Sequence, residues 1–327
     1  MLKFAKHLVP ATTAEAHEML LANRGARVLG GGLWLRQGRR AIACAIDLSA
    51  CGLDYIEESD DAFAIGAMTP LSDLERHRAF NDAICGVFER AVRDIVGVQF
   101  RNLATVGGSL YGRFGFSDVL TALMALDAEV EFTGAGRIGL PDFAAMPYER
   151  DILERLVVHR RPYRAAYGCM RRQATDFPVV NVCAAWWGDA WHVAVGARPL
   201  RACLLTGDEL GCTSEAPARE ELERALEAVR ALDYGTNYLA GAEYRRHIAG
   251  VLAVRAICEA AGIEVPPVLE ERFEREARSL EGEGGPGSPI ADDSMRAVAP
   301  AGADAARADA ASESVSSRPA PFEEVAR

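Results

Sequence analysis

The 327-residue sequence has almost no lysine: Lys3 and Lys6 are the only two, and every other basic residue is arginine. This is a composition bias, so no arginine is singled out merely for being arginine. The sequence also lacks a surplus of positive charge, because 47 acidic residues against 36 Lys and Arg give a formal net charge of −11. Such a surface repels phosphate groups, which argues against binding to nucleic acid or to an anionic membrane surface.

Long apolar runs are missing as well. We find no stretch of about 18 apolar residues that could span a bilayer and no N-terminal run of signal-peptide length. The eight cysteines never form a C-x-x-C pair, and the six histidines have no metal-ligand spacing. We therefore expect no metal or iron–sulfur cluster on this chain, and a cytoplasmic protein whose thiols stay reduced.

What the sequence does contain is a mixture of helix and strand patterns. A capping box at Thr12 and Glu15 predicts a helix that ends near Asn23. Further segments are expected as strands at 28–29, 43–48 and 62–67, helices at 81–96 and 117–126, and a hairpin of 129–133 with 137–140. Beyond a break near 160–162, strands at 163–171, 179–187 and 191–197 precede helices at 214–232 and 241–261. Strands followed by helices indicate a second α+β unit.

Two glycine-rich loops carry the chemical signal. One is Gly30-Gly31-Gly32, which follows a strand, and the other spans 101–118 and precedes a helix. Without a Cβ, a backbone can approach a diphosphate closely and turn its N–H groups toward the anion, and a helix start adds favourable partial charge. Taken alone, the first loop favours a plain tight turn over a binding site, and it is not the G-x-G-x-x-G of dinucleotide-binding folds.

The second loop resembles a known family. Its run RNLATVGGSL (101–110), followed by FSD (116–118) and a helix, is similar to the R-N-x-A-T-I-G-G-N…S-D signature of the FAD subunits of molybdenum hydroxylases, the family of xanthine dehydrogenase and carbon monoxide dehydrogenase. Matching segments recur in order at 28–35, 64–67, 140–143, 151–153, 171–176 and 243–246. The resemblance covers about residues 1–275.

The resemblance implies an α+β fold: an FAD-binding domain with two subdomains of the molybdopterin dehydrogenase (vanillyl-alcohol-oxidase-like) type, then a smaller domain with an antiparallel sheet. We assign residues 1–160 to the first domain, with a subdomain boundary near 50–60, and 161–275 to the second. Residues 276–327, rich in Gly, Pro, Ala, Ser and acids, are expected to be a disordered tail.

It also implies an electron-transfer role. FAD would collect electrons from 2Fe–2S clusters on a small subunit and pass them to NAD⁺ or another acceptor, while a molybdenum cofactor on a large subunit hydroxylates a purine such as xanthine. The residues implied to hold FAD are Leu29, Gly30, Gly31, Gly32, Leu33, Trp34, Thr105, Gly107, Gly108, Ser109, Gly112, Asp118 and Leu153. None of them is expected to be catalytic. Asp118 would accept hydrogen bonds from the ribityl or ribose hydroxyls of FAD and would also serve as a helix cap.

Some positions depart from the family pattern. Gly32 and Leu33 replace a threonine and a polar residue in the first loop, Ser109 replaces an asparagine, and Gly168 stands where a lysine is common. Trp34 is open to two interpretations, a cover for the flavin ring or a core aromatic. Arg171 and Arg172 are interpreted as a solvated strand edge, with contact to a partner or electron acceptor as the alternative. The alternatives are a carbon monoxide or N-heterocycle dehydrogenase subunit, a stand-alone flavoenzyme, and a scaffold without flavin.

Overall fold

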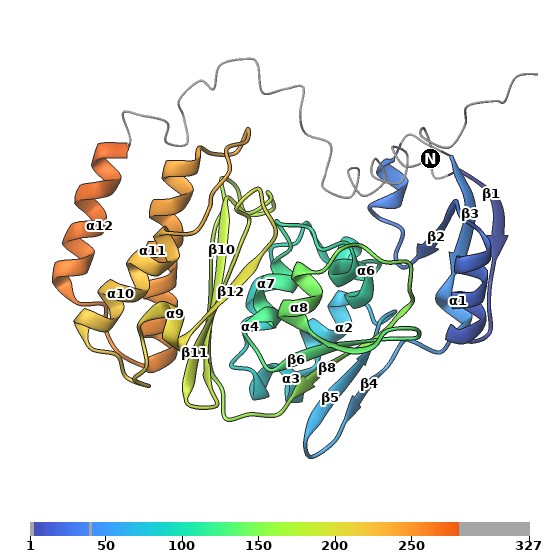
Figure 1. The fold of residues 1–327 in the computed structure, drawn as a ribbon, viewed down its shortest axis with the longest axis horizontal. Helices are drawn as coiled ribbons and strands as arrows, with labels where there is room; N and C mark the ends of the chain where they lie inside the picture. The colour runs from blue at the N-terminus through green and yellow to red at the C-terminus, as the bar shows by residue number, and fades with distance from the viewer. Residues whose placement is uncertain (1–2, 39–40, 281–327) are drawn as a thin grey trace, which may run out of the picture.

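The computed structural model describes residues 3–38 and 41–280, in which three β-sheets follow one another along the molecule (Figure 1). A three-stranded sheet lies at one end, a five-stranded sheet in the middle, and a four-stranded sheet with an outer layer of helices at the other end. The mixture of sheets and helices confirms the predicted α+β class.

The first sheet is parallel, with strand order β1-β3-β2. Its elements are β1 (Phe4–Leu8), α1 (Thr13–Ala22), β2 (Ala26–Leu29), η1 (Leu35–Gln37), β3 (Ile42–Asp47) and η2 (Leu48–Ala50). The predicted capping of α1 is confirmed, because the Glu15 amide donates to Thr12 Oγ1 at 3.2 Å. The second half of the predicted box differs, because the Glu15 carboxylate accepts from the amide of Ala11, at 2.8 Å, in place of that of Thr12.

The middle sheet is antiparallel, with order β4-β5-β8-β6-β7. Its strands are β4 (Ile56–Glu58), β5 (Ala62–Gly66), β6 (Ala128–Phe132), β7 (Gly136–Gly139) and β8 (Leu153–His159). The helices of this unit are α2 (Leu71–Arg76), α3 (Arg78–Ala83), α4 (Val87–Val92), α5 (Val98–Arg101), α6 (Val106–Tyr111), α7 (Asp118–Met124) and α8 (Leu140–Ala145). The predicted hairpin is confirmed as β6 and β7.

The prediction of a single helix over 81–96 is wrong. The chain breaks between α3 and α4, where Cys85 and Gly86 take left-handed φ angles of 57° and 70°. The Asn81 side chain stabilises the break, because its amide donates to Leu74 O at 2.9 Å and its oxygen accepts from Glu89 N at 3.0 Å. Both short helices bury their apolar side chains in one core, which is why the helical periodicity continued across the break.

The C-terminal sheet is antiparallel, with order β12-β11-β10-β9. Its strands are β9 (Arg164–Met170), β10 (Val180–Trp187), β11 (Ala190–Gly196) and β12 (Cys203–Thr206), and its helices are α9 (Gly207–Leu210), α10 (Arg219–Arg230), α11 (Ala242–Ala261) and α12 (Pro267–Leu280). The first three strands and two long helices confirm the predictions, whereas β12 and α12 were not predicted.

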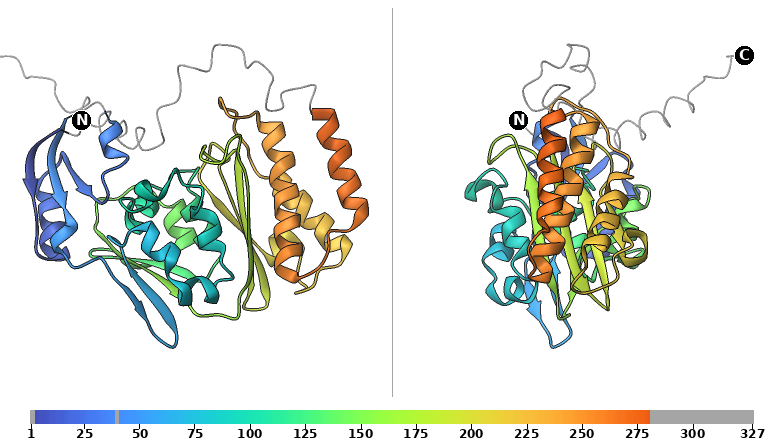
Figure 2. Two further views of the ribbon diagram at one scale, coloured as in Figure 1. Left: turned by 180° about the vertical axis from the view of Figure 1, so that it is seen from behind. Right: turned by 90° about the vertical axis from the view of Figure 1, so that its left-hand side faces the viewer.

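The C-terminal sheet is covered on both faces, which explains its apolar strands. Val182 and Ala184 of β10 point into the core shared with α10 and α11, while Cys183 and Ala185 point into the core shared with the middle unit. Figure 2 shows α4 and α7 on one side of this sheet and α11 on the other. The sheet is therefore the wall between the two halves of the molecule.

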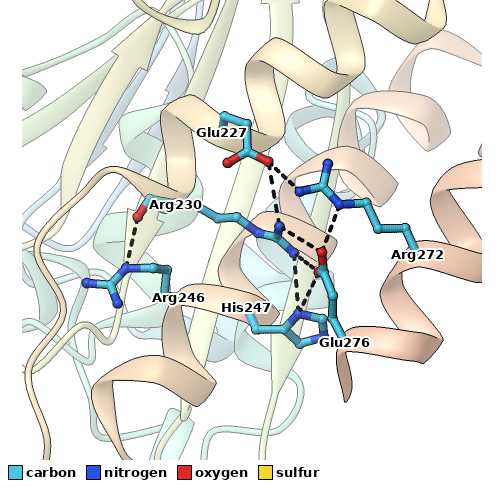
Figure 3. Close-up of polar contacts among 6 residues, drawn as sticks. All are labelled: Glu227, Arg230, Arg246, His247, Arg272 and Glu276. Atoms are coloured by element: carbon cyan, nitrogen blue, oxygen red, sulfur yellow. Dashed lines mark hydrogen bonds and ion pairs between the residues drawn. The ribbon is translucent and has the colours of Figure 1, made fainter. Parts of the chain in front are cut away.

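Helix α12 is held by Leu269 and Phe273, which are buried, and by a cluster of charged side chains on α10, α11 and α12 (Figure 3). In that cluster Glu276 pairs with Arg230 at 2.5 Å and with Arg272 at 2.8 Å. Residues 276–280, assigned to the tail from the sequence, thus belong to α12. The remainder of the predicted tail lies outside the described residues.

Candidate FAD-binding site

The first glycine loop, residues 30–34, begins where β2 ends. Gly32 has a φ of +68°, a left-handed conformation that glycine adopts without the steric cost of a side chain. At Gly31 the loop touches the second loop so closely that an added Cβ would lie 1.7 Å from Leu103 O. Glycine is therefore required at position 31 by the close packing of backbone on backbone and is favoured at position 32 by the positive φ.

The second glycine loop leads into α6, whose first turn is capped by Thr105. The Thr105 hydroxyl accepts from Gly108 N at 3.1 Å. The same oxygen would lie 2.7 Å from a Cβ on Gly30, so Thr105 also touches the first loop. On the other side of the helix, a Cβ on Gly107 would lie 2.6 Å from Ala67 Cβ, which fixes α6 against the middle sheet.

The amide groups of the two loops differ in what they bind. At the start of α6, Val106 N donates to Thr69 O, Gly107 N to Ala67 O, and Ser109 N to Thr105 O, at 2.9–3.0 Å. In the first loop, the amides of Gly31, Gly32 and Leu33 donate to no group of the described residues. The first loop therefore provides free N–H donors for an anion. The start of α6, whose amides are already hydrogen-bonded, mainly gives the cavity wall its shape.

The two loops face a cavity of about 390 Å³, lined by residues from all three units. That volume is within the range of cofactor and ligand pockets. Twelve of the thirteen predicted site residues line it: Gly30, Gly31, Gly32, Leu33, Trp34, Thr105, Gly107, Gly108, Ser109, Gly112, Asp118 and Leu153. Leu29 is not in the lining, since it ends β2 in the ladder with Asp47 of β3.

Asp118 begins α7 beside its N-cap, Ser117, and is 5% exposed. Its carboxylate accepts from the Tyr167 hydroxyl at 2.5 Å and from Asn181 Nδ2 at 3.0 Å, and it pairs with Arg171 at 2.8 Å. Burial raises the pKa of Asp118, an effect that the Arg171 charge and these hydrogen bonds oppose. The residue joins the cavity wall to the C-terminal sheet.

Arg171 corrects a prediction. It was interpreted as part of a solvated strand edge, but its side chain is only 9% exposed and lies between Asp118 and the carbonyl of Asp176. Arg172, in contrast, is exposed as expected. The sequence offered no local signal for this difference, because the partner of Arg171 is 53 positions away along the chain.

An aromatic cluster forms part of the cavity wall. The Trp34 ring lies 5.1 Å from Phe114, 5.4 Å from Phe116 and 5.9 Å from Phe177, measured between ring centroids. Trp34 is half-buried among these rings and also lines the cavity, so it is not a fully buried core aromatic, and its role as a cover for the flavin ring stays a prediction. Phe177, which was not predicted as a site residue, comes from the C-terminal unit and is 42% exposed.

Other departures from the family pattern have a structural context. Gly168 faces α11, because an added Cβ would lie 3.3 Å from Leu252 Cδ2, so the missing lysine removes nothing from the cavity wall. The Ser109 hydroxyl donates to Thr105 O at 2.9 Å within its own helix. Arg27, Tyr111 and Tyr148 also line the cavity and were not predicted. No cluster of metal-binding side chains is found in the described ranges.

Comparisons with known proteins agree with this geometry. Residues 2–160 match the model of the family described as the FAD binding domain in molybdopterin dehydrogenase. The chain is 31% identical over 231 residues to the uncharacterized protein YgfM of Escherichia coli K12, covering 67% of this chain and 82% of that one. It is 26% identical over 283 residues to the nicotine 6-hydroxylase medium subunit of Paenarthrobacter nicotinovorans, covering 78% and 96%.

Among solved structures, the fold is similar to a chain of reconstituted CO dehydrogenase from Oligotropha carboxidovorans. The TM-score is 0.70 at 23% identity, and the match covers 81% of this chain and all of that chain. At this identity the likeness concerns the fold. Within the described residues, no helix is long and apolar enough to cross a membrane.

Proposed function

Because the chain belongs to the family of FAD-binding subunits of molybdenum hydroxylases, we propose that it passes electrons within such an enzyme, on the pattern of xanthine dehydrogenase, and delivers them to NAD⁺. The chain is an oxidoreductase subunit whose cofactor is FAD. The observation that carries the proposal is the contact between the two glycine loops. Gly30 packs against Thr105 and Gly31 against Leu103, and the two loops line one cavity.

The residues present fit FAD. The amides of Gly31, Gly32 and Leu33 are donors for the diphosphate, and the Thr105 hydroxyl retains its proton for a phosphate oxygen. Gly107 keeps α6 close enough to form the opposite wall. When bound, FAD supplies the redox chemistry, accepting electrons singly and releasing them as a pair. The chain holds the cofactor, limits its exposure to water and sets its electrostatic surroundings.

The proposed partners are a large subunit with the molybdenum cofactor and a small subunit with 2Fe–2S clusters. The relatives that support this are named as medium subunits or medium chains, such as those of nicotine 6-hydroxylase and of a Sulfolobus glyceraldehyde dehydrogenase. We propose a cytoplasmic location, which the eight free cysteines support, since a reducing compartment keeps thiols unpaired.

We propose an N-heterocycle as the hydroxylated substrate, with a purine as the first candidate. The purine assignment rests on the GRFGFSD form of the second loop at 112–118. The wider class of N-heterocyclic substrates is supported by relatives whose names include nicotine and nicotinate. Carbon monoxide remains the alternative on the basis of fold alone.

The first experiment is an absorption spectrum of the purified full chain, followed by heat release and chromatography of any bound flavin. FAD at about one per chain supports the proposal, whereas a colourless protein that also fails to bind added FAD would favour a scaffold without flavin. Affinity purification of the tagged chain from its native cells then tests the partners. The purified complex is assayed for NAD⁺ reduction with xanthine, nicotinate or carbon monoxide, and failure with all three would overturn the substrate and acceptor assignments.

A further inference from the structure

We propose that Arg171 is a positioning residue for FAD: its guanidinium fixes the Asp118 carboxylate on one side and the cavity rim at Asp176 and Phe177 on the other. The inference rests on the proposed function, since it concerns the same FAD site. It assigns to the C-terminal unit a direct part in completing a site whose glycine loops belong to the other two units.

The first contact of Arg171 is with Asp118, at 2.8 Å between a guanidinium nitrogen and Oδ2. An ionised carboxylate offers about four positions for hydrogen bonds. Tyr167, Asn181 and Arg171 occupy three of them, and Asp118 also lines the cavity. One acceptor position is therefore left for a cofactor hydroxyl, and its direction is set by the three partners that hold the carboxylate.

The second contact is with the rim. Another nitrogen of Arg171 donates to the carbonyl oxygen of Asp176 at 2.6 Å. The next residue, Phe177, places its ring 4.6 Å from that of Phe116 and close to Trp34. A single guanidinium thus positions both a polar acceptor and an aromatic wall, which the compact charge of lysine could not reproduce because it lacks the planar fork.

Removing Arg171 would leave the Asp118 carboxylate buried without its counter-charge. The other groups around it are Tyr167, Cys169 and Asn181 of the C-terminal sheet, with Asp94 beyond Cys169. None of these is a cation, so the charge could not be balanced locally. The carboxylate would then either move out of place or take up a proton, and a buried ion pair that loses one partner is strongly disfavoured.

The test measures FAD binding by fluorescence titration of the full-length apoprotein between about pH 6 and about pH 9. The variants are Arg171→Met, Arg171→Lys and, as the matched control, the exposed neighbour Arg172→Met. We expect Arg171→Met to weaken FAD binding by about 10- to 100-fold at the alkaline end. The loss of FAD affinity should become smaller at lower pH, because protonated Asp118 is uncharged and can return to its buried position.

Arg171→Lys should remove the pH dependence, because the charge is restored, and still bind FAD more weakly than wild type, because the contact with Asp176 is lost. The Arg171→Lys variant also tests the proposal if Arg171→Met does not fold. Wild-type affinity in both Arg171 variants would overturn the role of Arg171 alone. A loss that is equal at every pH and is matched by Arg172→Met would also overturn it. A wild-type chain that binds no FAD would overturn the proposed function together with this inference.

Discussion

A Cβ placed on Gly31 would lie 1.7 Å from the carbonyl oxygen of Leu103, so the two glycine loops meet backbone against backbone. This contact fixes the distance between the loop that offers free amides and the helix that forms the opposite wall. No side chain can be added at Gly31 unless the loops move apart.

We therefore expect Gly31→Ala to reduce FAD affinity by about 10-fold or more, because overpacking of this kind displaces backbone. Fluorescence titration of the apoprotein measures the effect. Gly139→Ala is the matched control, since a Cβ there would lie at an ordinary 3.6 Å from Asp142 Oδ2. Equal affinities for the two variants would show that the loops can separate without consequence.

Thr105 caps α6 and also contacts the first loop. Thr105→Ala should lower the free energy of unfolding by about 1 kcal/mol, the usual effect of removing an N-cap hydroxyl. Thr105→Ser keeps the hydroxyl and should retain most of that stability. Urea denaturation of the apoprotein checks both values, and a serine variant as unstable as the alanine variant would show that the methyl group, not the cap, matters.

Arg245 is a fully buried arginine in the C-terminal unit. Its guanidinium donates to the carbonyl oxygens of Val179 and Ala197 and to the side chain of Asn237. Arg245→Met would take this donor from the buried carbonyl oxygens of Val179 and Ala197, whereas Asn237 would keep its bond from the Leu239 amide. We expect a loss of about 3 kcal/mol or more in the free energy of unfolding. Its neighbour Arg246, which is partly exposed, is the control.

Arg246→Met should cost only about 1 kcal/mol, because it removes one ion pair with the exposed Glu243 and one hydrogen bond to the carbonyl oxygen of Arg230. Similar losses for the two variants in urea denaturation would contradict the structural distinction between these two neighbouring arginines of α11.

Glu276 in the cluster of Figure 3 predicts a pH dependence of stability. Burial alone would raise its pKa, but hydrogen bonds and charges from Arg230 and Arg272 lower the pKa to about 2. The unfolded chain therefore binds more protons than the folded chain below the ordinary value of 4.5. The stabilisation from Glu276 is complete above that value and is lost as the pH falls toward about 2.

Thermal unfolding of Glu276→Gln and wild type from about pH 6 to about pH 3 tests this. The wild type should be more stable at the upper end, and the difference should narrow as the pH falls. Glu243→Gln is the control, since Glu243 makes an exposed pair with Arg246. A difference between wild type and Glu276→Gln that stays constant with pH would contradict the assignment.

Local signals in the sequence predicted local structure well. The capping box of α1 involves residues three and four positions apart, and the hairpin of β6 and β7 depends on a short glycine turn. Periodicity alone failed at 81–96, because a buried apolar face does not reveal a left-handed break at Cys85 and Gly86. Helix α12 was not predicted although Leu269 and Phe273 give it an apolar face, and its last residues, 276–280, were assigned to the polar segment that follows.

The sequence by itself determined the two glycine loops, the family they belong to and twelve residues of the cavity lining, because glycines that allow close backbone contact are recognisable in a short run. Only the tertiary structure decided which loop offers free amides and which arginine is buried. Those properties depend on acceptors such as Ala67 O and Asp118, which lie far away along the chain and reach the site only when the three sheets pack together.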